Sequence, residues 1–251
     1  MHTQIEHLEA LSSHLLDGFL ALRERYALLE PMLFDQKVVA TRGSGKQARG
    51  FMSLRQSLFL ICVQDIAKII ADTDKRAPSI RNITSVLENA PLNTLRERYA
   101  VWNLPLPQQE TDPEIILALR RIELCEETER RTQFDELLKE LKTLRNILDT
   151  APVITVFRTI RDKLTAHTEV RFIADKYQTI DITMLGIKWG DMKTVIADIQ
   201  RAVELIGLLV RNACFAWNLL DEQLDNSATA FWSSGTHTTN PTLHPHVKNS
   251  G

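Results

Sequence analysis

The residues best suited to chemistry stand together in one stretch, which reads Ile-Arg-Asp-Lys-Leu-Thr-Ala-His over residues 160–167. It places Arg161 and His167 six positions apart, and His167 is the only histidine between His14 and His237. An arginine binds phosphate through charge-assisted hydrogen bonds, and a histidine exchanges protons near neutral pH. These two side chain types are enough to cut RNA without a metal.

The pair sits on a predicted helix from Pro152 to about Val170. At about 100° per residue, four apolar side chains form one stripe along this helix, and they are Val153, Phe157, Ile160 and Leu164. His167 falls on one border of the stripe and Arg161 on the other, about 120° and about 9 Å apart. The two groups converge poorly within one helix, and better if two copies of the helix meet across a two-fold axis.

The chemistry of such a shared cleft would be internal transesterification of RNA. His167 would take the proton from a ribose 2′-hydroxyl, while Arg161 would neutralise the charge that builds on the phosphate. A second histidine, from the partner chain, would protonate the leaving 5′ oxygen. The products are a 2′,3′-cyclic phosphate and a 5′-hydroxyl, and DNA would survive because it lacks the nucleophile.

A purely structural interpretation of the same residues stays open. His167 would then be a core histidine bound to a backbone carbonyl, and Arg161 would belong to an ion pair. Burying a guanidinium is costly unless it is paired, so Arg161 requires a partner in either case. That partner is a carboxylate or a substrate phosphate.

Composition describes an ordinary globular chain of 251 residues, 44% hydrophobic and 25% charged. The net charge of −2 means that any contact with nucleic acid must be a local patch. Cys62, Cys125 and Cys214 are each expected to be buried free thiols in a reducing cytoplasm. The polar N-terminus does not resemble a signal peptide, and the apolar runs are shorter than the roughly 20 residues of a membrane span. We therefore expect a cytoplasmic protein.

Periodicity predicts an all-α bundle of about five to seven helices. A helical domain over residues 1–225 would comprise an N-terminal helix over 3–29 ended by Pro31, a flexible basic loop over 37–50, and a core bundle over 51–225. Residues 226–251 are rich in Ser, Thr and Asn, and are predicted to be a disordered tail. The other predicted helices cover residues 51–71, 79–88, 93–103, 113–148 and 191–224, with Asp191 as the N-cap of the last.

Other motifs give weaker indications of function. Residues 40–47 read Ala-Thr-Arg-Gly-Ser-Gly-Lys-Gln and lack the first glycine and the final Ser or Thr of a phosphate-binding P-loop. As a basic loop, this segment could still contact a polyanion. His7 and His14 share a helix face without completing a metal-ligand set, so they are expected at the surface. No metal or cofactor is expected.

The Arg-polar-His spacing resembles the signature of HEPN-domain proteins, with Asp162 in the polar place. The surrounding residues 157–167 resemble the abortive-infection AbiU-like branch, and so do residues 53–58, 70–72 and 79–80. This resemblance covers about Phe51 to Leu224.

The resemblance implies a helical homodimer with metal-independent RNase activity, acting in phage defence or in a toxin–antitoxin pair with a cognate antitoxin. It implies Arg161 and His167 as catalytic residues and Asp162 as the residue that orients them. Nearby basic side chains are candidates to hold the RNA, namely Arg158, Lys163 and Arg171. Where some relatives carry a tyrosine that a partner enzyme modifies, this chain has Glu169.

Two alternatives remain. The chain could be a non-catalytic helical binding or assembly module, because basic residues around the motif outnumber acidic ones only slightly. It could also be an antitoxin or immunity partner. Growth arrest on expression indicates a toxin, whereas rescue indicates an antitoxin.

Overall fold

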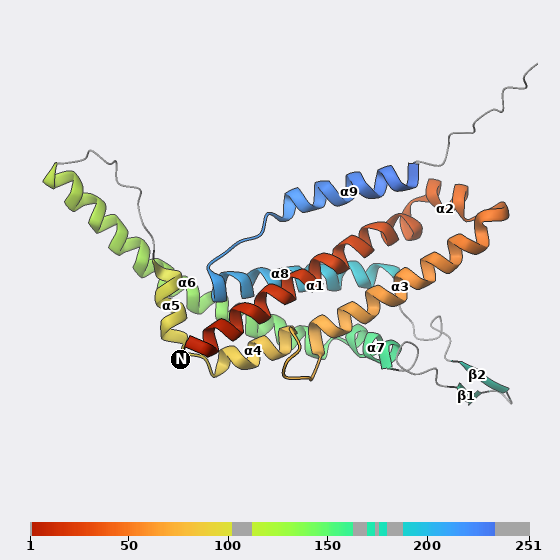
Figure 1. Cartoon of the computed structure of the whole chain (residues 1–251), viewed down its shortest axis with the longest axis horizontal. Helices are drawn as coiled ribbons and strands as arrows, with labels where there is room; N and C mark the ends of the chain where they lie inside the picture. The colour runs from red at the N-terminus through yellow and green to blue at the C-terminus, as the bar shows by residue number, and fades with distance from the viewer. Residues whose placement is uncertain (1, 102–111, 163–169, 174–175, 180–187, 234–251) are drawn as a thin grey trace, which may run out of the picture.

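The computed structural model describes residues 2–101, 112–162, 170–173, 176–179 and 188–233 (Figure 1). The fold is all-α, with nine α-helices, one 3₁₀ turn and a two-stranded hairpin in the described residues. The elements are α1 His2–Phe34, α2 Gln36–Arg42, η1 Gly45–Gln47, α3 Ala48–Ala71, α4 Ile80–Glu88, α5 Leu92–Ala100, α6 Pro113–Thr150, α7 Pro152–Ile160, β1 Val170–Ile173, β2 Lys176–Thr179, α8 Trp189–Arg211 and α9 Trp217–Ser233. An all-α bundle is therefore confirmed, with more helices in the described residues than the five to seven predicted.

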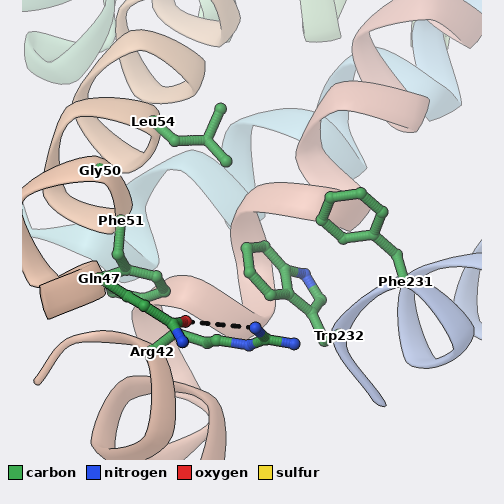
Figure 2. Close-up of a pocket in the computed structure, with 7 residues that line it drawn as sticks. All are labelled: Arg42, Gln47, Gly50, Phe51, Leu54, Phe231 and Trp232. Atoms are coloured by element: carbon green, nitrogen blue, oxygen red, sulfur yellow. Dashed lines mark hydrogen bonds between the residues drawn. The ribbon is translucent and has the colours of Figure 1, made fainter. Parts of the chain in front are cut away.

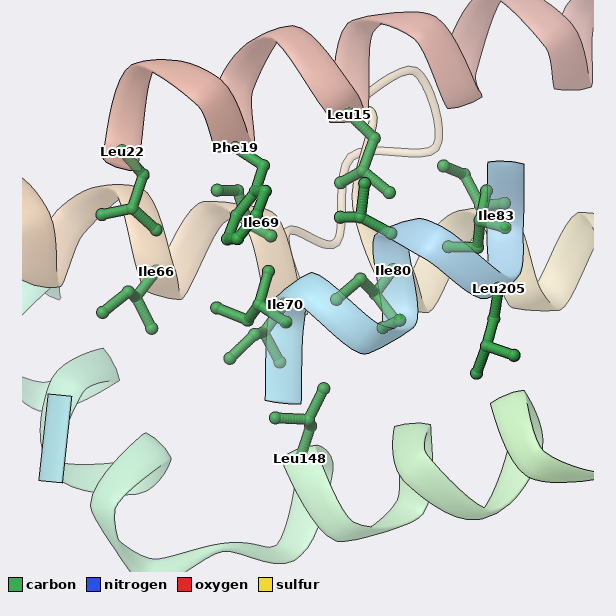
Figure 3. Packing of buried hydrophobic residues seen from close by; sticks show 14 of the residues in the cluster. Leu15, Phe19, Leu22, Ile66, Ile69, Ile70, Ile80, Ile83, Leu148 and Leu205 are labelled. Carbon is green, nitrogen blue, oxygen red and sulfur yellow. The ribbon is translucent and has the colours of Figure 1, made fainter. Parts of the chain in front are cut away.

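The core lies where α1, α3 and α8 pack together, with α4 and α6 closing its sides. Figure 3 shows Leu15, Phe19 and Leu22 of α1 directed toward the isoleucines of α3. The stripe predicted for the first helix is confirmed, since its side chains are buried at spacings of three and four residues. α9 lies along α1 on the outside of the bundle (Figure 1).

The sequence predicted that Pro31 ends the first helix, and this prediction is wrong. The helix continues to Phe34, and the Asp35 amide donates to the Pro31 carbonyl at 3.0 Å. A proline removes only one intrahelical donor, whereas Met32 in the last turn is fully buried. Burial of this side chain holds the turn in place.

The segment predicted as a flexible loop over 37–50 is mostly helical. The Asp35 carboxylate caps α2 by accepting from the Lys37 amide at 2.8 Å and the Val38 amide at 3.4 Å. Gly43 ends α2 at a point where a Cβ would lie only 2.5 Å from the Val39 carbonyl oxygen. The glycines therefore mark a tight reversal from α2 into α3, and that part of the prediction is wrong.

The polar stretch of α6 over residues 125–133 is an unbroken helix in the half of α6 that projects from the bundle (Figure 1). Contacts with α5 hold its base. The Arg130 guanidinium lies 4.6 Å from the centre of the Tyr99 ring, and the Tyr99 hydroxyl donates to Gln133 at 2.9 Å. Polar contacts here replace the apolar seam that α6 has from Phe134 onward.

The helix predicted over 191–224 is two helices. Asn212 adopts the left-handed conformation at φ 52° and ends α8, after which the chain turns and begins α9 at Trp217. The N-cap position of α8 is Lys188 rather than Asp191, whose carboxylate accepts from the Lys188 amide at 2.9 Å. α9 continues to Ser233, past the predicted start of the tail at residue 226, and residues 234–251 lie outside the described residues.

The helix predicted from Pro152 to about Val170 is helical as far as Asp162, with α7 ending at Ile160, and residues 163–169 lie outside the described residues. Val170 begins strand β1, which pairs with β2 in antiparallel register. The strand contains Val, Phe and Ile, residue types that favour extended structure. The prediction is therefore wrong at its last residue, Val170.

The packing of the core allows a prediction of how much stability is lost when one aromatic side chain is removed. Phe19→Ala removes a fully buried ring that packs edge-on against Trp217 at 5.6 Å, and should lower the free energy of unfolding by about 3–5 kcal/mol. Phe34→Ala on the same helix removes a ring that is 49% exposed and should change it by less than about 0.5 kcal/mol. Chemical denaturation measures both, and equal losses would contradict this account of the core.

The cysteines differ in exposure, contrary to the expectation that all three are buried. Cys62 is buried, whereas Cys125 and Cys214 are exposed. Burial, reinforced by the nearby Asp65 carboxylate, raises the pKa of the Cys62 thiol to about 12. We expect two fast-reacting thiols with an aromatic disulfide reagent and a third only after unfolding, because the thiolate is the nucleophile. Three thiols reacting at one rate would show the Cys62 environment to be wrong.

Candidate functional site

Helix α7 is held by an apolar face that is completely buried. Ile154, Phe157 and Ile160 are each inaccessible to solvent, and α7 packs against α3 and α6. Pro152 occupies the first turn, where its fixed backbone angle favours a helix start. A helix of nine residues is not stable alone in water, so its position is set by this packing.

Arg161 and Asp162 follow directly, in a π-helical turn. The Arg161 Nε donates to the Asp162 Oδ1 at 2.7 Å, with the side chains 27% and 58% exposed. The guanidinium thus lies at the border between core and solvent, beside a carboxylate. π-helical turns are rare and occur often at functional sites.

Arg158 ties α7 to the rest of the bundle through a series of charges. Its Nη2 donates to the Asp149 Oδ1 at 3.0 Å, and the other Asp149 oxygen lies 3.6 Å from the Nε of Arg145. Arg145 in turn reaches Glu88 at 3.4 Å. The side chains of α4, α6 and α7 are connected in this way, and the positive charge of Arg158 is compensated within the protein.

The chain returns from the hairpin to the bundle at Trp189, the first residue of α8. Its ring meets Phe59 of α3 edge-on at 5.1 Å, and the Arg55 guanidinium lies 5.9 Å from its centre. Trp189 is still 43% exposed. The sequence analysis did not select Arg55 or Trp189 as site residues, since a pairing between two helices leaves no local motif in the chain.

The structure places some of the predicted site residues and not others. It places Arg158, Arg161 and Asp162 on one turn at the end of α7. Arg171 lies in β1 opposite Gln178, and only its backbone is described. Lys163 and His167 lie outside the described residues, so the predicted convergence of Arg161 and His167 is left as a proposal.

Within the described residues, no group of three or more His, Cys, Asp or Glu side chains is arranged to hold a metal ion. Over the same residues, no helix combines the length and apolarity that crossing a membrane requires. His7 and His14 are exposed on α1, as predicted.

Comparison with protein families matches the chain to the HEPN AbiU2 family (AbiU2) over residues 5–231. The chain belongs to the AbiU branch of the HEPN superfamily. No curated protein and no solved structure matches it.

The HEPN AbiU2 match confirms the resemblance seen in the motif and extends beyond the range over which it was recognised. It includes the core helix α1 and the outer helix α9, together with the end of α7. Membership of this family suggests a role in abortive-infection phage defence. The superfamily includes RNases, so the Arg161 turn is the natural candidate for an active site.

The ion pair between α6 and α7 can be tested in this HEPN AbiU2 domain. Asp149→Asn leaves Arg158 and Arg145 part-buried without their shared carboxylate and should lower the free energy of unfolding by about 1–3 kcal/mol. Glu222→Gln removes a carboxylate from an exposed position on α9 and should have little effect. Thermal denaturation at matched pH compares them, and an unchanged midpoint for Asp149→Asn would show that the pair does not anchor α7.

Proposed function

We propose that this HEPN AbiU2 protein is a metal-independent endoribonuclease that acts in phage defence or as the toxin of a toxin–antitoxin pair. The observation that carries the proposal is the position of Arg161, at the end of α7 beside Asp162, in a chain that belongs to a family whose superfamily includes RNases. The charge-assisted pair gives the guanidinium a defined orientation at the edge of solvent.

The reaction proposed is attack of a ribose 2′-oxygen on the adjacent phosphorus. His167 accepts the 2′-hydroxyl proton, the bond from phosphorus to the 5′ oxygen breaks, and that oxygen receives a proton from a second histidine. Arg161 binds the phosphate and offsets the negative charge that develops on its oxygens. Asp162 orients Arg161 through the 2.7 Å contact. No metal or other cofactor takes part in this scheme.

A homodimer would supply the second histidine. Two copies related by a two-fold axis present the same surface to each other, so each contributes one Arg161 and one His167 to a shared cleft. The end of α7 suits this arrangement, because Arg161 and Asp162 are accessible there while the preceding turns of the helix are anchored in the core.

Arg158, Lys163 and Arg171 are proposed to hold the RNA strand next to the reacting phosphate. For Arg158, binding phosphate carries an energetic cost. Its guanidinium already pairs with Asp149 at 3.0 Å, so it would contact phosphate only by sharing or exchanging that carboxylate.

The test is RNA cleavage by purified protein in EDTA. His167→Ala removes the proposed base and should lower the rate by about 10²- to 10⁴-fold. Arg161→Ala should lower it by about 10²- to 10³-fold. His7→Ala and Arg81→Ala, at exposed positions on α1 and α4, are matched controls that should cut like wild type.

Equal cleavage by all five proteins, with melting temperatures unchanged, would show that these residues are not the active site. Expression in cells separates the alternatives. A toxin arrests growth only with Arg161 and His167 intact, a binding module does not arrest growth through these residues, and an antitoxin or immunity partner rescues growth when its toxin is present.

A further inference from the structure

One segment of the chain carries positive charge without any negative charge, and it contains none of the predicted site residues. From Gln36 to Gln64 the chain contains five basic residues and no acidic one, although the net charge of the whole protein is −2. The segment forms α2, η1 and most of α3. Its basic residues are Lys37, Arg42, Lys46, Arg49 and Arg55.

Three of these side chains are exposed and unpaired. Lys37, Lys46 and Arg49 have no carboxylate partner within the part of the chain that the structure describes. Elsewhere the arginines are largely paired across helices, as Arg201 is with Glu140 and Arg131 with Glu97. A cluster of unpaired cations repels itself unless a polyanion neutralises it.

Aromatic side chains from the far end of the chain lie against this cluster. Figure 2 shows Phe231 and Trp232 of α9 facing Phe51 and Leu54 of α3, with Arg42 below them. The Phe51 and Trp232 rings lie edge-on at 6.0 Å, and the Trp232 indole donates to the Leu28 carbonyl at 3.2 Å. Trp232 is therefore fixed, while Phe231 beside it is 52% exposed.

Two open cavities meet at this point, and both are lined by Arg42 and Trp232. One measures about 330 Å³ and includes Gln47 and Phe231, and the other measures about 450 Å³ and includes Lys37. Together they form a groove between α2, the start of α3 and the end of α9, which we name the basic groove. Each cavity is within the range of a bound small molecule or nucleotide.

Negative charge is almost absent from the groove walls. The one carboxylate among the lining residues is Asp35, which is engaged in capping α2 at 2.8 Å. After Asp225 the sequence contains no further Asp or Glu. The groove walls thus combine the cations Lys37 and Arg42 with a half-exposed aromatic ring, and the exposed Lys46 and Arg49 directly precede the lining residues Gln47 and Gly50 in the chain.

We propose that the basic groove binds a single-stranded segment of the RNA substrate, an inference that rests on the proposed nuclease function. Lys37, Arg42, Lys46 and Arg49 neutralise successive phosphates, and Phe231 stacks on a base. Stacking platforms beside a cationic track are how proteins hold single strands without reading sequence. Helix α2, which lines the groove, and the β1–β2 hairpin lie toward the same end of the long axis of the molecule (Figure 1).

The experiment measures binding of a fluorescent single-stranded RNA of about 15 nucleotides. The full chain carries His167→Ala, so that the RNA is not cut. Adding Arg42→Gln, Lys46→Gln and Arg49→Gln should weaken binding at least tenfold. It should also lower the slope of log K against log salt by about 2, since each single-strand phosphate contact contributes about 0.7.

The matched control removes three exposed arginines outside the groove, namely Arg81→Gln on α4 with Arg120→Gln and Arg121→Gln on the projecting half of α6. This control lowers the net charge by the same amount as the groove triple variant and should change RNA binding less than about twofold. Phe231→Ala should weaken binding about fivefold or more, as expected for loss of one stacked base. Leu219→Ala, an exposed apolar truncation on the same helix, should leave it unchanged.

The proposal is overturned if the groove triple variant and the control triple variant bind RNA equally. It is also overturned if the groove binds vesicles with anionic lipid more tightly than it binds RNA. Cleavage assays are read separately. Groove-dependent binding without any cleavage by wild type leaves the basic groove standing and removes the nuclease function. Cleavage by wild type, with RNA binding that does not depend on the groove, supports the nuclease function and removes the basic groove.

Discussion

The burial of one face of α7 is the interaction on which the candidate site depends. Ile154, Phe157 and Ile160 are inaccessible to solvent, and each contributes on the order of 1.5–3 kcal/mol by leaving water. Without that burial a nine-residue helix would not form. Arg161 follows the last buried residue, so its depth and direction are set by apolar packing one residue earlier. The Arg158–Asp149 pair then fixes the rotation of α7 against α6.

Charge in this molecule serves two different purposes in two places. Across the bundle, arginines pair with carboxylates of other helices, as Arg96 does with Asp135 and Arg98 with Glu9. These exposed pairs are individually weak and mainly favour one arrangement of the helices. At the end formed by α2 and the start of α3, cations stand without carboxylates. A near-neutral protein can therefore still present a strong local attraction to a polyanion, and most of its surface would stay indifferent to nucleic acid.

The sequence was sufficient for those parts of the fold where packing follows helical periodicity. The apolar stripe of α1 is buried, and helical periodicity also describes the α6 seam of Leu137, Leu141, Leu144 and Leu148, of which all are buried except the half-buried Leu144. Predictions failed where one capping or packing contact overrides the local signal. Met32 holds a turn beyond Pro31, Asp35 caps a helix in an apparent loop, and Asn212 ends a helix inside a continuous apolar pattern.

The sequence proposes residue types for the candidate site but not their surroundings. A short motif selects Arg161 and Asp162 as candidates through residue type and spacing, and their catalytic role stays a proposal. The pairing of Arg158 with Asp149, and the meeting of α9 with the basic segment, depend on tertiary contacts. Helical periodicity also extended a regular α-helix past Ile160, whereas the structure has Arg161 and Asp162 in π-helical conformation.

The central claim is that the 2′-hydroxyl of RNA is the nucleophile, with a protein side chain rather than a metal as the base. Analysis of the ends left by cleavage in EDTA tests it most directly. The account predicts 2′,3′-cyclic phosphate and 5′-hydroxyl ends, and no cut at a position where the ribose is replaced by 2′-deoxyribose. Ends with a 3′-hydroxyl and a 5′-phosphate, or equal cutting at the deoxy position, would contradict it.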